Sequence, residues 1–92
     1  MTTLHIVHRL DNGHLPGAFA RAFAEGDALL LTGDGVYAAL ADRAALPAAT
    51  RALADAVRAR GLLPQWPDDL ALVDAAGFVA LVATHAKSLS WG

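Results

Sequence analysis

The sequence predicts an α/β domain in which helices cover both faces of a mainly parallel sheet. Short apolar segments at Leu4–Val7, Ala28–Leu31 and Leu70–Val73 alternate with stretches of helical periodicity, a pattern typical of parallel sheets. The segment Ala28–Leu31 has no polar alternation, so as a strand it must be covered on both of its faces. The 92 residues fit a single domain that spans the whole chain, 1–92.

The N-terminal part of the chain predicts one strand and one helix. Leu4–Val7 is a strand with His5 inside it, and a polar loop with an Asn-Gly turn follows. Pro16 suits the first position of a helix, and Gly26 suits a left-handed C-cap. The apolar face of this helix is expected to consist of Leu15, Phe19, Ala22 and Phe23.

The second strand, Ala28–Leu31, leads into a Gly33-Asp34-Gly35 turn. Asp34 is placed to cap a helix over Val36–Asp42. A glycine-flanked turn between a strand and a helix is also where open α/β sheets bind anions. We expect an ordinary capping turn, because the third glycine and the lysine of phosphate-binding loops are missing and Asp34 would repel phosphate.

The stretch 44–60 allows two interpretations. Its alanine content and the helical spacing of its aliphatic residues favour a helix after Pro47. The competing interpretation places a strand at Arg51–Ala54, followed by a short helix that Asp55 caps and Gly61 ends. The residue pattern by itself leaves both interpretations open.

The last third of the chain predicts a loop, a strand, a helix and an edge strand. Leu62–Asp69 is a proline-containing loop, and Leu70–Val73 is a strand. Asp74 is placed to cap the next helix, and the tail Lys87–Trp91 is expected to form an edge strand. The inner face of the helix is expected to hold Phe78, Leu81, Val82 and His85.

Composition narrows the classes of function. The net charge is −2 and there is no basic run or basic helix face, so direct nucleic-acid binding is not expected. No apolar stretch approaches the roughly 18 residues of a membrane helix, and no signal-peptide pattern is present, so we expect a cytoplasmic protein without membrane contact. Apolar residues make up 55% of the chain, an excess that indicates surface for an oligomer to cover.

Few residues point to chemistry. The absence of cysteine excludes disulfides, thiolate ligands and covalent sulfur chemistry on this chain. The four histidines are dispersed and are expected at the surface or the core edge, so no metal site is predicted. Large aromatic side chains are core or interface anchors. Here these are Tyr37, Trp66 and Trp91, and Trp91 is expected either to fold back or to be covered by a partner.

Several groups of residues together resemble the TusB/DsrH family. Their order and spacing cover nearly the whole chain. The resemblance implies a flavodoxin-like three-layer domain with about five strands, and it favours the strand at Arg51–Ala54. The matching groups are Leu4–Val7; Glu25–Leu31 with Asp34–Ala39; Ala52–Asp55 with Ala59–Leu62; and Val73–Val79 with Leu81, Val82, His85 and Trp91.

The resemblance implies a subunit of a sulfur-relay heterohexamer built from three related chains. The implied partners are DsrE/TusD-like and DsrF/TusC-like subunits, with self-association in their absence and no cofactor. The relay would serve 2-thiolation of the wobble uridine in tRNA or oxidation of stored sulfur, with the persulfide carried chiefly by the DsrE/TusD-like partner. Some DsrH-type members carry a cysteine on the first helix, where this chain has Ala18-Phe19-Ala20. We therefore expect a non-catalytic, partner-binding subunit.

The expected partner contacts lie in two parts of the chain. The turn after the second strand is the expected contact near a neighbour's active site, and the last helix and the tail supply aromatic anchors. No catalytic or metal-binding residue is predicted. The alternative function is a small α/β module that binds an anionic metabolite at the Gly33–Gly35 turn. The expected contact residues are Asp34, Gly35, Tyr37, Phe78 and Trp91.

Overall fold

The computed structural model describes residues 2–91 and consists of one five-stranded sheet with helices on both faces. The strand order is β4-β3-β2-β1-β5, and every neighbouring pair is parallel. The prediction of a small α/β, flavodoxin-like domain with a parallel sheet is therefore confirmed. The strands are β1 (Thr3–Val7), β2 (Ala28–Leu31), β3 (Thr50–Leu53), β4 (Ala71–Val73) and β5 (Lys87–Trp91).

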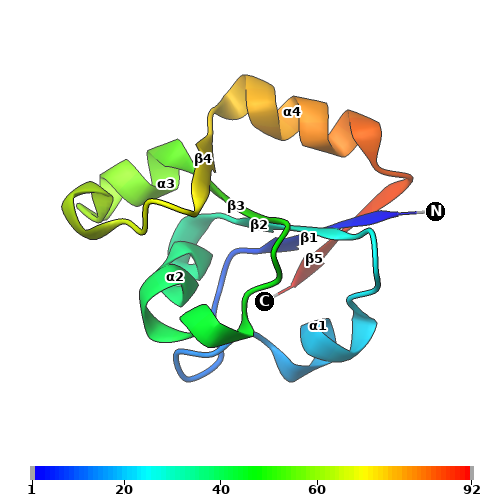
Figure 1. Ribbon diagram of the computed structural model, residues 1–92, viewed down its shortest axis with the longest axis horizontal. Coiled ribbons are helices and arrows are strands. Elements are labelled where there is room, and N and C mark those ends of the chain that lie inside the picture. The colour runs from blue at the N-terminus through cyan, green and yellow to red at the C-terminus, as the bar shows by residue number, and fades with distance from the viewer. Residues whose placement is uncertain (1, 92) are drawn as a thin grey trace.

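The helical segments divide unequally between the two faces of the sheet. Connections between parallel strands are right-handed, so the three that step from β1 to β4 share one face and the one that returns to β5 crosses the other. In Figure 1, α4 accordingly lies on one side of the sheet, and α1 and α2 lie on the other. The helices are α1 (Gly17–Ala22), α2 (Ala38–Ala41), α3 (Ala54–Ala59) and α4 (Ala75–Thr84), with 3₁₀ turns η1 (Gly33–Tyr37), η2 (Arg43–Ala45) and η3 (Leu63–Gln65).

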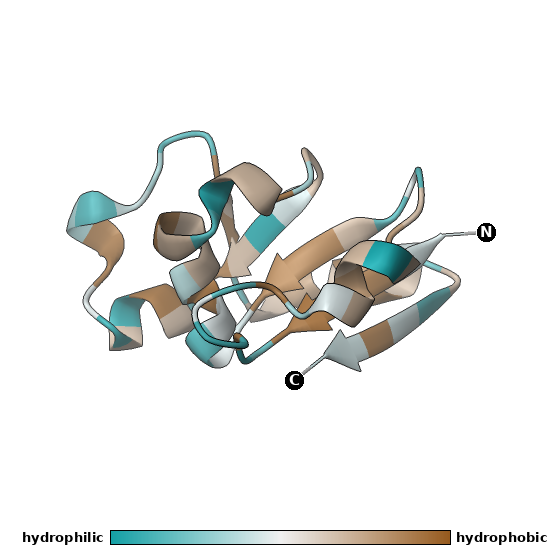
Figure 2. Ribbon diagram, turned by 90° about the horizontal axis from the view of Figure 1, so that it is seen from below, coloured by the Kyte–Doolittle hydropathy of each residue, from teal (hydrophilic) through white to brown (hydrophobic). Residues whose placement is uncertain are grey.

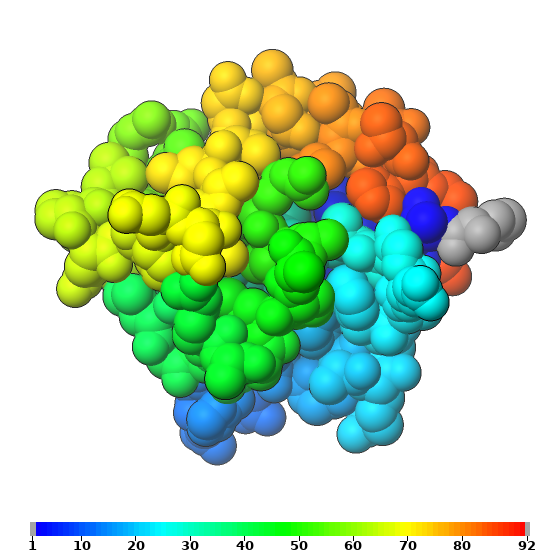
Figure 3. Space-filling view, viewed as in Figure 1, coloured from blue at the N-terminus to red at the C-terminus, as the bar shows by residue number. Residues whose placement is uncertain are grey.

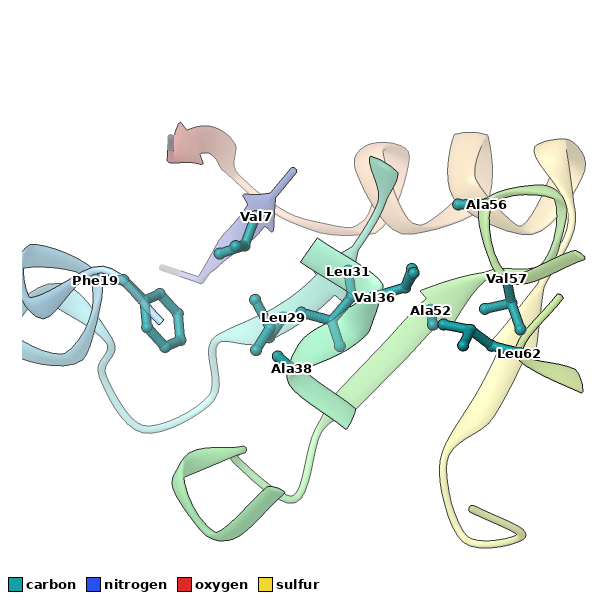
Figure 4. Close-up of a cluster of buried hydrophobic side chains, with 10 residues drawn as sticks. All are labelled: Val7, Phe19, Leu29, Leu31, Val36, Ala38, Ala52, Ala56, Val57 and Leu62. Carbon is teal, nitrogen blue, oxygen red and sulfur yellow. The ribbon is translucent and has the colours of Figure 1, made fainter. Parts of the chain in front are cut away.

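The strand β2 forms the centre of the core. All four of its residues are at most 5% exposed, which confirms the expected cover on both faces. Leu29 and Leu31 belong to the cluster on the α1 and α2 side, where their side chains lie between those of Phe19 and Val57 (Figure 4). Ala28 and Leu30 belong to the smaller cluster beneath α4. In Figure 2 the central arrows are accordingly brown, whereas the strand that leads to the C-terminus is mostly pale.

Two helix caps predicted in the first half of the chain are wrong. Helix α1 ends at Ala22, and the next residue, Phe23, is extended with φ −72° and ψ 125°, so Gly26 is not its C-cap. Gly26 instead takes φ +89° in the following turn, which the side chain of Asp27 closes by accepting a hydrogen bond from the amide of Ala24 at 3.0 Å. Asp34 does not cap a helix either, because η1 begins at Gly33 without a side-chain cap.

The ambiguous stretch 44–60 forms a strand and a short helix. The strand at Arg51–Ala54, which the family resemblance favoured, is confirmed as β3, and the helix after Pro47 that alanine content favoured is not formed, because β3 pairs with β2 on one side and with β4 on the other. Backbone hydrogen bonds on both edges outweigh the weak intrinsic preference of alanine for a helix. Helix α3 follows, but Asp55 forms an ion pair with Arg58 at 3.1 Å and does not cap it.

The predictions for the last third of the chain are largely confirmed. The side chain of Asp74 caps α4 by accepting a hydrogen bond from the amide of Gly77 at 2.8 Å. Phe78 and Leu81 face the sheet, whereas Val82, predicted to face inward, is 42% exposed. Strand β5 is an edge strand next to β1, as expected. Within residues 2–91, no helix combines the length and the apolar character needed to cross a membrane.

Candidate functional site

The five expected contact residues occupy different depths. Asp34 and Tyr37 are exposed, and Tyr37 shows 39% of its surface. Gly35 is buried, whereas Phe78 packs from α4 onto the smaller core cluster and Trp91 packs against the larger one. Asp34, Gly35 and Tyr37 lie together on η1. Their role as partner contacts stays a prediction.

An ion pair fixes the turn after β2. The carboxylate of Asp34 accepts a hydrogen bond from Nε of Arg60 at 3.0 Å, and Nη2 of the same guanidinium lies 2.9 Å from the same oxygen. Nη1 of Arg60 donates to the carbonyl of Ala56 at 3.1 Å, so the pair joins η1 to α3. The guanidinium of Arg60 is therefore already paired, and the carboxylate of Asp34 faces solvent there. This arrangement does not favour an anion site at Gly33–Gly35.

The glycine at position 35 is required by close packing. A Cβ built on Gly35 would lie 2.1 Å from the carbonyl oxygen of Val7. The amide of Gly35 donates to the carbonyl of Thr32 at 2.8 Å, and the amide of Thr32 donates to that of Val7 at 3.0 Å. The turn therefore lies directly on the end of β1, and Gly35 positions its neighbours Asp34 and Tyr37.

A buried polar network joins both ends of the described chain to β2. His5 is 1% exposed, and its Nε2 lies 2.8 Å from Oδ2 of Asp27. Asp27 also accepts the amide hydrogen of Thr3 at 2.9 Å. On the other side of the ring, Nε1 of Trp91 donates to Nδ1 of His5 at 3.1 Å. Trp91 is thus folded back onto the core in this chain.

The pKa of Asp27 reflects this network. The hydrogen bond with His5, and then those from the amides of Thr3 and Ala24, lower the pKa from 3.8 to about 2 against the opposing effect of burial. A carboxylate that accepts several hydrogen bonds is stabilised in its charged form. Asp27 is therefore ionised at neutral pH, and it compensates for its burial by satisfying three donors.

Sequence reasoning missed this network. It placed the histidines at the surface or the core edge, whereas His5 lies inside the core. One signal was available: His5 is a titratable residue within an apolar strand, and a buried polar group needs a partner. The sequence does not identify that partner, because Asp27 is 22 residues away and is one of several aspartates.

The outward surface of α4 is apolar. The segment Ala75–Thr84 has no charged residue, and none of its residues is buried. Val79 is 66% exposed and Val82 is 42% exposed. In Figure 3, α4 forms the orange upper rim of the molecule, with its outer side open. A helix that is apolar on all sides is normally covered on all sides.

A cavity of about 410 Å³ lies where α3 and α4 leave the sheet on opposite faces. Its charged residues already have partners: Arg58 pairs with Asp55, and Asp74 caps α4. The lining residues are Ala54, Arg58, Leu72, Val73, Asp74 and Gly77. Within residues 2–91, no group of three or more histidine, aspartate or glutamate side chains is arranged to hold a metal ion.

The fold and these surfaces define a small parallel α/β protein whose buried polar groups hold its own strands and whose longest described helix is apolar on its outer side. Such apolar exposure is characteristic of subunits. A family model described as "DsrH like protein" matches residues 17–88. The chain belongs to the TusB/DsrH family, which supports a sulfur-relay subunit in general.

Curated relatives agree over nearly the full chain. A protein named Protein TusB from Escherichia coli K12 is 36% identical, and the match covers 96% of this chain and 99% of the relative. The Protein TusB of Klebsiella pneumoniae is 40% identical over 80% of this chain and 84% of its own length. That of Shigella dysenteriae is 35% identical, with 96% and 99% covered.

Proposed function

We propose that the protein is a non-catalytic subunit of a persulfide-transfer complex. Its partners are DsrE/TusD-like and DsrF/TusC-like subunits in a cytoplasmic heterohexamer. Family membership supports this proposal. The absence of cysteine supports the non-catalytic role, because a persulfide needs a thiol to carry it. The partners would then hold the sulfur.

The observation that carries the proposal is the apolar outer surface of α4. The two six-residue helices carry charges, Arg21 on α1 and Asp55 with Arg58 on α3. The ten-residue helix α4 carries none. Leaving valine and alanine in water forgoes roughly 25 cal/mol for each Å² that a partner could cover. Obligate interfaces resemble a protein core in this respect. We therefore assign the outer surface of α4, centred on Val79, to partner binding.

The turn on η1 is the second proposed contact. Tyr37 and Asp34 are exposed beside the carboxyl ends of β1 and β2, where Arg60 pairs with Asp34 and the buried Gly35 lies against Val7. Rigid aromatic groups are common anchors at interfaces. Phe78 and Trp91 would support the contact surfaces from beneath, since both pack inward in the isolated chain. The complex would deliver the sulfur either for 2-thiolation of the wobble uridine in tRNA or for sulfur oxidation.

The test is co-purification. The tagged protein is co-expressed with DsrE- and DsrF-like chains, and the complex is sized by light scattering. Val79→Lys should weaken assembly at least about tenfold, because the interface would bury an unpaired ammonium group. Ala59→Lys on α3 is the matched control, since it places the same charge on an exposed helical position. Circular dichroism checks that both variants fold.

Three outcomes are informative. Assembly of the wild type and Ala59→Lys, with loss for Val79→Lys, supports both the function and the surface. Unchanged assembly of Val79→Lys refutes α4 as the interface while leaving the subunit function in place. A wild-type chain that stays monomeric and binds neither partner refutes the proposed function.

A further inference from the structure

Besides its backbone pairing with β1, the C-terminal strand has a side-chain link to the core through one ring nitrogen of His5. Trp91 ends β5, and its indole Nε1–H donates to Nδ1 of His5 at 3.1 Å. The two ring planes are 15° apart with centroids at 6.0 Å, so the indole N–H reaches the imidazole at its edge. Strand β5 is otherwise exposed from Lys87 to Ser90. The side chain of Trp91 is therefore the main contact between the side chains of β5 and the core, in addition to the backbone pairing of β5 with β1.

This hydrogen bond can form with only one protonation state of His5. An indole nitrogen is a donor and never an acceptor, so Nδ1 must carry a free lone pair. The other ring nitrogen, Nε2, faces the carboxylate of Asp27. An ionised carboxylate can accept a hydrogen bond but cannot donate one. The ring is therefore neutral, with its proton on Nε2. A second proton would place N–H against N–H at the contact with Trp91.

We propose that neutral His5 anchors β5 through Trp91, and that protonation of His5 detaches Trp91 and loosens the C-terminal strand. The argument depends on the difference between the attached and detached states. Asp27 contacts His5 from the turn before β2, so it attracts the added proton in both states. Trp91 opposes the proton only while it is attached. Detachment therefore takes up a proton, and acid favours it.

Asp27 and Trp91 are the groups that determine how readily His5 takes up a second proton. Phe19 and Phe23 of α1 contact the ring with centroids at 5.4 Å and 5.2 Å, and neither titrates. The charged residues on the elements packed against His5 are Arg21 of α1, Glu25 of the following turn and Lys87 of β5. All three are exposed, whereas the carboxylate of Asp27 contacts the ring directly.

Detachment would expose a specific part of the molecule. Strand β5 pairs with β1 from Thr3 to Val7, and the backbone link at its far end, from the amide of His8 to the carbonyl of Trp91, is long at 3.4 Å. Loss of the indole bond would therefore release the Trp91 end first. The aromatic rings of Phe19 and Phe23 and the edge of β1 would then become accessible.

The test follows backbone amide exchange and the two indole N–H signals by NMR on the whole chain, between about pH 7.5 and about pH 5.5. We expect the protection factors of β5 to fall at least about tenfold on acidification, because one proton is taken up when the strand opens. Trp66 is an internal reference, since its Nε1 donates to the backbone carbonyl of Leu70. Its signal should not move.

Trp91→Phe is the decisive variant. It keeps an aromatic ring on the core but removes the donor, so the protection of β5 should be lower at pH 7.5 and should change less than about twofold with pH. His14→Gln is the control, because His14 is an exposed histidine outside the network, and it should retain the wild-type response. The proposal is overturned if β5 protection is independent of pH, if Trp91→Phe shows the same decrease, or if all strands lose protection together.

Discussion

The buried carboxylate of Asp27 should be a major contributor to stability at neutral pH. Asp27→Asn keeps the size of the side chain but removes its charge. It also leaves one acceptor oxygen for donors from His5, Thr3 and Ala24. The network would then lack acceptors, and the new amide group would face Nε2–H of His5. We therefore expect a marked loss of unfolding free energy.

The magnitude follows from the pKa. A decrease from 3.8 to about 2 in the folded state corresponds to about 2 kcal/mol at roughly 1.4 kcal/mol per unit. Unsatisfied donors add about 1 kcal/mol, giving a total of about 3 kcal/mol at pH 7. Because the folded pKa is lowered, the charge stabilises the fold above pH 3.8. This contribution declines as the pH falls towards 2, and it is about half its neutral value near pH 3.

Urea unfolding at fixed protein concentration measures this loss. Asp55→Asn is the control, because Asp55 pairs with Arg58 on the surface with its side chain 80% exposed, and such pairs contribute at most about 1 kcal/mol. The difference between wild type and Asp27→Asn should shrink between pH 5 and pH 3. The reasoning is refuted if Asp27→Asn costs no more than Asp55→Asn at pH 7, or if the difference does not shrink in acid.

Two further substitutions test the local packing. Gly35→Ala should cost at least about 3 kcal/mol in urea unfolding or prevent folding, because its Cβ would lie 2.1 Å from the carbonyl oxygen of Val7; Gly17→Ala meets nothing closer than 3.7 Å and should be neutral or stabilise α1 by up to about 1 kcal/mol. Asp74→Ala should cost about 1 kcal/mol by the same measurement, because it removes the cap on the amide of Gly77; an unchanged midpoint would contradict that role.

The sequence predicted the order of strands and helices because hydrophobic patterning is local. The fully apolar segment at β2 required two covered faces, and Asp74 was recognised as a cap from its position before a helical pattern. The stretch that became β3 could not be assigned in this way. Its alanines favour a helix locally, and the strand exists because β2 and β4 lie on either side of it.

The interactions at the candidate site were harder to predict because they join distant residues. Asp34 looked like a cap, but Arg60, 26 residues away, binds it. His5 and Trp91 are 86 residues apart and meet only because β1 and β5 are neighbours in the sheet. Local patterns identify the residue types that such contacts need. They do not identify which two residues meet.

The distribution of polar and apolar groups is the strongest argument for a subunit. An independent monomer normally places charge on its exposed helices. In this chain α4 exposes valine and alanine. Asp27, by contrast, is buried at the centre of a network that holds β1, β2 and β5 together. That network fixes the sheet from within, so the outer surface of α4 is not needed for folding. Val79→Lys should therefore change assembly and leave stability nearly unaltered, whereas Asp27→Asn should lower stability first and assembly only through it.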